Sequence, residues 1–183
     1  MAANDILGEV ADRLVGGMML HSDHADLMCF LGLKGLKRYH EKGYHDDAMK
    51  LRKTHRMSIK YTGMLLPQSS QERSDDLDAF MNYSRHDLDT EAKRNALEGA
   101  MKSWAEWEQG TVIAYSRAAR DLWGINEAVL WKKVFKWQRE AEKELAMVHK
   151  LMCEMETCDW DMCHILDMQG PLHERYHNPC GRK

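Results

Sequence analysis

Proline and phenylalanine are scarce in this sequence, which has three of each in 183 residues. A protein built from many short strands needs a turn every few residues, so this scarcity argues against an all-β fold. Methionine is abundant instead, with 14 residues, and 44% of the chain is hydrophobic against 30% charged. This balance is typical of a globular domain with a real core, and it predicts an all-α protein.

The sequence also lacks any apolar run of the roughly 20 residues that a membrane span needs. Its first residues, "MAANDILGEV", have neither the charged nor the apolar region of a secretory signal. The five cysteines are odd in number, which fits a reducing compartment better than a disulfide framework. We therefore expect a cytoplasmic protein.

Motifs of several enzyme classes are missing. The chain has no Gly-rich phosphate loop, no nucleophile elbow and no Ser/His/Asp arrangement, so a hydrolase or kinase is not indicated. The formal net charge of −3 provides no general attraction to nucleic acid. The absence of the enzyme motifs favours a binding or assembly role.

The first half of the chain predicts a helical hairpin. Apolar periodicity without proline predicts one helix from Asn4 to about Glu41, which ends near Gly43. A second helix is predicted from Asp46 to Tyr61. Glycines at 32 and 35 leave open a hairpin that turns there instead.

Residues 67–88 are polar and rich in turn formers, and they are too long for a hairpin loop. We expect them to form a crossover. Two more helices follow, at about 90–122 and 126–156, joined by the tight turn "LWGINE", in which Asn126 can cap the fourth helix. The predicted organisation is a helical domain at 1–157 and a C-terminal extension at 158–183 that packs on the bundle or on a partner subunit.

One long crossover after the second of four helices resembles the arrangement of the ferritin-like superfamily. The resemblance covers residues 4–156 and is carried by "YTGMLLP", "NALEGAMKSWAEWEQGTVIAYSRAA" and "FKWQREAEKELAMVHKL". It implies a ferritin-like four-helix bundle. The Glu-x-x-His pairs of such bundles are absent: Lys143 follows Glu140 where a histidine would stand, so the usual two-metal centre is not expected. A surface ion pair between Glu140 and Lys143 is the alternative.

Polar residues interrupt two of the predicted inner faces. On the first helix the spacing of three and four places His21 and His24 among apolar residues, and on the third it places Glu108 in the middle of such a face. A carboxylate buried there needs a cation, a metal or hydrogen-bond donors. The inner faces predicted for the four helices are Leu7, Val10, Leu14, Gly17, His21, His24, Met28 and Leu31; Ala48, Leu51, His55, Ser58 and Thr62; Leu97, Met101, Trp104, Glu108, Thr111, Tyr115, Ala118 and Leu122; and Val134, Gln138, Ala141, Leu145, Val148 and Met152.

These faces suggest a metal site in the middle of the bundle. Its candidate ligands are His21, His24, His55, Glu108 and Glu140. Imidazole and carboxylate together suit iron, zinc or manganese. The alternative is a polar layer of hydrogen-bonded His and Glu without a metal.

Two functions follow from this reading. The first is a divergent ferritin-like protein that binds a transition metal; the second is a non-enzymatic oligomeric module that binds a partner protein or sequesters a small anionic ligand. The surplus of Trp and Met predicts a homo-oligomer. Tryptophans interleaved with cations at 131–139 are more typical of core and interface than of base stacking, although stacking stays open.

Overall fold

The computed structural model describes residues 2–66 and 88–175, whose regular structure consists of helices only. The all-α prediction is confirmed for these residues. The helices are α1 (Ala3–Leu31), α2 (Lys34–Thr62), α3 (Thr90–Gly124), α4 (Ala128–Thr157) and α5 (Met162–Arg175). Within the described ranges, no helix is both long enough and apolar enough to cross a membrane.

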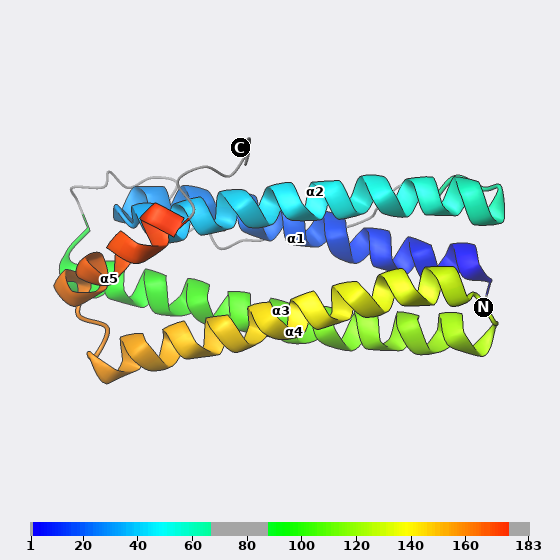
Figure 1. Ribbon diagram of the computed structural model, residues 1–183. Helices are drawn as coiled ribbons and strands as arrows, with labels where there is room; N and C mark the ends of the chain where they lie inside the picture. Colours follow the sequence, from blue (N-terminus) through cyan, green and yellow to red (C-terminus); the bar gives the residue numbers. More distant parts are fainter. Residues whose placement is uncertain (1, 67–87, 176–183) are drawn as a thin grey trace.

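The four long helices lie side by side, and α5 lies at one end of them (Figure 1). Helices α1 and α2 run in opposite directions, as do α3 and α4, whereas α2 and α3 run in the same direction. The end of α2 and the start of α3 are therefore at opposite ends of the molecule. The predicted crossover between them falls on residues 67–87, which lie outside the described part of the chain.

The first hairpin turns at Gly32, so the prediction of one helix from Asn4 to about Glu41 is wrong, as is a second helix that starts at Asp46. Gly32 has a left-handed backbone with φ of 84°, and the Leu33 N–H bonds to the carbonyl of Met28 at 2.8 Å, which ends α1. The alternative turn at residues 32–35 is the observed one. Gly43 instead lies inside α2.

The turn between α3 and α4 also differs from its prediction. Asn126 does not cap α4; it takes the left-handed conformation, with φ of 62°, that asparagine tolerates better than most residues. Glu127 occupies the N-cap position, without a side-chain hydrogen bond. The bounds of α3 and α4 otherwise follow the apolar periodicity to within two residues.

The hydrophobic core has two parts. One part includes Leu14 and Tyr115, and the other includes Leu20, Trp104 and Val148. On α2, α3 and α4 the two parts are separated by a stretch that contains charged residues, and on α1 they are separated by residues 15–19, which include Gly16 and Gly17. Polar groups therefore occupy the middle of the molecule.

The inner faces of α1 and α3 are confirmed, because every residue predicted for them is buried. Of the face predicted for α2 only Ser58 is buried, so its register is wrong: Lys50 and Thr54 are buried, whereas Leu51 and His55 are half-exposed. On α4, Val134, Ala141 and Val148 are buried as predicted, but Gln138, Leu145 and Met152 are only half-buried.

The C-terminal extension contributes α5, which contacts α2 and α3. Its Gln169 accepts a hydrogen bond from the Leu36 N–H at 2.9 Å. This bond satisfies a free donor in the first turn of α2, which begins without a side-chain cap. Ile165 is fully buried in the same core cluster as Trp104.

Candidate functional site

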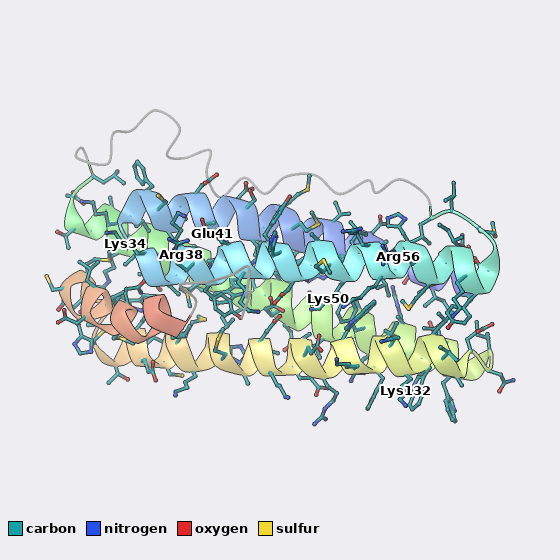
Figure 2. The ribbon with its side chains drawn as sticks, turned by 45° about the horizontal axis from the view of Figure 1, so that its top comes forward. Lys34, Arg38, Glu41, Lys50, Arg56 and Lys132 are labelled. Carbon is teal, nitrogen blue, oxygen red and sulfur yellow. The ribbon has the colours of Figure 1, made fainter. Side chains whose placement is uncertain are left out.

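Charged side chains from all four long helices meet between the two parts of the core. We call this set the ionic layer; its members are Arg13 of α1, Asp47 and Lys50 of α2, Glu108 of α3 and Glu144 of α4. They line a cavity of about 10 Å³, together with Thr111 and Tyr115. Lys50 lies between α2 and α4 in Figure 2. The cavity is at most large enough for one water molecule.

Arg13 is held in place by α3. Its Nε donates to Thr111 Oγ1 at 2.8 Å, and another guanidinium nitrogen donates to the carbonyl of Trp107. The guanidinium carbon lies 3.4 Å from the centre of the Trp107 ring, in cation–π contact. Burial lowers the pKa of Arg13, and the carboxylate of Glu108 opposes that effect. Arg13 is thus a fixed positive charge in the layer.

Lys50 is the second cation. Its Nζ lies 3.7 Å from Asp47 Oδ1 and 3.8 Å from Glu140 Oε2. Burial by itself would lower the pKa of Lys50, but the carboxylates of Glu144 and Asp47 outweigh it and raise the pKa. Glu140 also pairs with Lys136 at 3.6 Å, so its partners are Lys50 and Lys136 rather than the predicted Lys143.

The acids of the layer hold their protons more tightly than usual. Burial, with the charge of Glu144 added, raises the pKa of Glu108 to about 8. Burial likewise raises the pKa of Asp47 to about 7, against the opposing charge of Lys50. Glu108 is 3% exposed and accepts a hydrogen bond from Trp104 Nε1 at 3.2 Å, which supplies the partner that its burial requires. The layer therefore carries protons near neutral pH.

Two features of the sequence indicate the ionic layer once its position is known. Asp47 and Lys50 repeat the Glu-x-x-His spacing with lysine in the histidine position, as Glu140 and Lys143 do on α4. Gly17, inside α1, leaves room for the carboxylate of Asp47, which a side chain at this position would meet. A glycine inside one helix, paired with an acid on the neighbouring helix, is the sequence feature that could have predicted the ionic layer.

Three imidazoles form a second polar cluster, which we call the histidine layer: His21 and His24 of α1 and His40 of α2. Nδ1 of His21 lies 2.9 Å from Nδ1 of His40, and the ring of His24 meets the ring of His40 edge-on, with 5.1 Å between their centres. Burial lowers the pKa of His21 to about 3 and that of His40 well below its usual value. Both rings are neutral at physiological pH.

His40 is the member that sequence reasoning missed. A first helix ending near Gly43 placed this residue beside a turn, whereas the observed turn at Gly32 carries it into α2 opposite His21. Its Nε2 is buried and has no hydrogen-bond partner among the described residues. The Trp104 ring, 4.5 Å from that of His40 between centres, connects the histidine layer to Glu108.

The five predicted metal ligands fall in different places. His21 and His24 lie together in the histidine layer, and Glu108 lies in the ionic layer. Glu140 lies at the rim of the ionic layer, with 38% of its side chain exposed, and His55 is half-exposed outside both layers. In the part of the chain that the structure describes, no group of three or more His, Cys, Asp or Glu side chains has its donor atoms arranged around a metal position.

A surface cleft of about 430 Å³ reaches the histidine layer between α1 and α2. His21 forms part of its lining, and so do Asp26, Tyr44 and His45. Arg38 and Glu41, which Figure 2 labels near the start of α2, pair with each other at 3.5 Å. The cleft gives small molecules or ions a route toward His21.

Comparison with known proteins leaves the chain without an assigned family: no family model matches it, and no match was found among curated proteins or solved structures.

Proposed function

We propose that the protein is a ferritin-like four-helix bundle that binds one transition-metal ion through its histidine layer. The antiparallel pairs α1–α2 and α3–α4, and the common direction of α2 and α3, support the ferritin-like assignment (Figure 1). Imidazole ligands favour zinc or iron over manganese among the metals expected from the sequence.

The observation that carries this proposal is the close approach of His21 and His40. Two nitrogen ligands at about 2.1 Å from one ion lie about 3.0 Å apart at the 90° angle of an octahedral ion and about 3.4 Å apart at the tetrahedral angle of zinc. The 2.9 Å between the two Nδ1 atoms is close to the octahedral separation. His24 would become the third ligand after a rotation of its ring, which lies 5.1 Å from that of His40 between centres. One of the two Nδ1 atoms carries the proton of their hydrogen bond, and this proton would have to move to Nε2 of the same ring before both Nδ1 atoms could bind the ion; the neutral rings need not lose a proton otherwise.

The ionic layer does not suit a metal. Arg13 and Lys50 place two fixed positive charges among its carboxyl groups, where a ferritin-like centre would hold its cations. A divalent ion would have to displace them or bear their repulsion. We therefore assign no two-metal oxidation chemistry to this protein.

Metal content tests the proposal. Protein purified without chelator should carry close to one metal per chain, and His40→Ala and His24→Ala should each lose most of it. His55→Ala is the matched control, because this histidine lies outside the layer, and it should retain the metal. Because the pKa values of His21 and His40 are low, protons should not compete with the metal for these two rings between pH 7 and pH 5. A wild-type protein that stays empty after incubation with zinc and with ferrous salts would reject the site.

A second function, an oligomeric assembly module, is favoured by apolar side chains near the end of α2. Ile59, Met64 and Leu65 are 53%, 55% and 76% exposed. Such side chains gain free energy when a partner covers them.

Sedimentation analysis should accordingly show dimers or larger species at micromolar concentration. Leu65→Glu should shift the protein toward monomer, because it places a charge in the apolar contact. Ile113→Glu, at a residue of α3 that is 60% exposed, should leave the assembly intact. A wild-type protein that is monomeric throughout this concentration range contradicts the assembly role.

A further inference from the structure

Three aromatic rings form a contiguous surface ladder where α3 turns into α4. The ring centres of Trp123 and Trp131 lie 4.9 Å apart, and those of Trp131 and Phe135 lie 5.5 Å apart, with the latter pair stacked at 22°. Trp123 is 61% exposed and Phe135 is 42% exposed. Large aromatic rings left in water this way indicate a surface that another molecule covers.

Positive charges flank the ladder. Residues 128–139 of α4 contain four cations and no acid, although the whole chain carries a net charge of −3. The helical step of 100° per residue places Lys132, Lys136 and Arg139 on the side next to Trp131 and Phe135. Lys132 points away from the bundle on the outer side of α4 (Figure 2).

Glu127 precedes this stretch, and two of its cations pair with acids in the next turn of α4. Lys136 lies 3.6 Å from Glu140 and Arg139 lies 3.3 Å from Glu142. These pairs are exposed, so they are weak and exchange readily with another anion. In the described part of the chain Lys132 has no ion pair. The surface beside the ladder is therefore positive.

We propose that the ladder of Trp123, Trp131 and Phe135, with its flanking cations, binds single-stranded nucleic acid. Each exposed ring face can stack an unpaired base, and the cations lie where the adjoining phosphates would run. A second copy of this surface fits less well, because two positive surfaces repel each other. An acidic peptide would satisfy the cations but leave the rings without planar partners.

Titration with a fluorescently labelled oligothymidine of 15 nucleotides tests the proposal. Trp123→Ala should weaken binding about tenfold, the range expected for one lost base stack. Lys132→Glu should also weaken it. The matched controls are Tyr44→Ala, an aromatic residue of α2 that is 40% exposed, and Lys150→Glu, at the other end of α4; both should bind like the wild type.

Salt dependence and competition separate stacking from simple charge attraction. If three cations engage phosphates, affinity should fall about 20-fold between 50 and 200 mM salt. Polyglutamate should compete poorly. The proposal is overturned if polyglutamate competes as well as unlabelled oligothymidine does, or if no binding is measurable at 50 mM salt. It is also overturned if the tryptophan fluorescence is quenched only by self-association of the protein and not by the oligonucleotide. The site does not depend on the histidine layer, so Trp123→Ala should retain the metal content of the wild type.

Discussion

Replacing Lys50 by methionine should lower the free energy of unfolding by about 3 kcal/mol at pH 8, the usual cost of removing one partner from a buried ion pair. Lys50 is 8% exposed, and Asp47 and Glu140 lie within 4 Å of its Nζ. Methionine fills a similar volume, so the loss reports the charge and not a cavity. Denaturant unfolding followed by circular dichroism measures it.

The loss should be smaller at pH 6.5. The pKa of Asp47 is raised to about 7 and that of Glu108 to about 8, so both groups bind protons more tightly in the folded state than in the unfolded state. An acid with a raised pKa destabilises the fold progressively as pH rises from its unfolded pKa to its folded pKa. Removing Lys50 raises the pKa of Asp47 further. The difference in unfolding free energy between the wild type and Lys50→Met therefore continues to grow above pH 7, by about 1.4 kcal/mol per pH unit for each proton.

Above pH 6.5 the change of stability with pH reports the buried acids and not the histidines. The folded-state pKa values of His21 and His40 are lowered, so their ionisation destabilises the fold only below the unfolded value of 6.5. Lys102→Met is the control, because Lys102 forms an exposed ion pair with Glu98 at 2.6 Å, and it should leave the stability close to that of the wild type at either pH. An equal loss for Lys50→Met at pH 6.5 and pH 8 would show that the carboxyl groups do not titrate as described.

Alanine at Gly43 should destabilise the protein by about 1 to 3 kcal/mol, the typical cost of overpacking a close contact. A methyl group on this residue of α2 would lie 2.6 to 2.8 Å from three atoms of the His21 ring. That ring is buried and bonded to His40, so it has little room to retreat. The loss is expected even though alanine normally stabilises a helix interior by about 1 kcal/mol relative to glycine, a gain that offsets part of the overpacking cost.

Gly99→Ala provides the comparison within α3. A methyl group there has no neighbour within 4 Å, so the variant should gain up to about 1 kcal/mol in the same unfolding experiment. Opposite signs for the two alanine variants support the close packing of α2 on His21. If Gly43→Ala proves as stable as Gly99→Ala, then the two helices are farther apart than described.

Composition determined the helical class, and apolar spacing determined the bounds of α3 and α4 and the inner faces of α1 and α3. On α3 the face from Leu97 to Leu122 carries large apolar residues on both sides of Glu108, so the burial of this acid follows from its position. A continuous apolar face sets the register of a helix because turning it would expose that face to water.

Only the tertiary structure decided the register of α2 and which residues join His21, His24 and Glu108 in the two polar layers. The inner face of α2 carries His40, Lys50, Thr54 and Ser58, so hydrophobicity gives no preference for the observed register over one that buries His55. Lys50 is buried because carboxyl groups on α2 and α4 neutralise it, and His40 is buried because the turn at Gly32 brings it against His21. Such partners lie far apart in the sequence, and the electrostatic and hydrogen-bond energy that selects them exists only once the helices have packed.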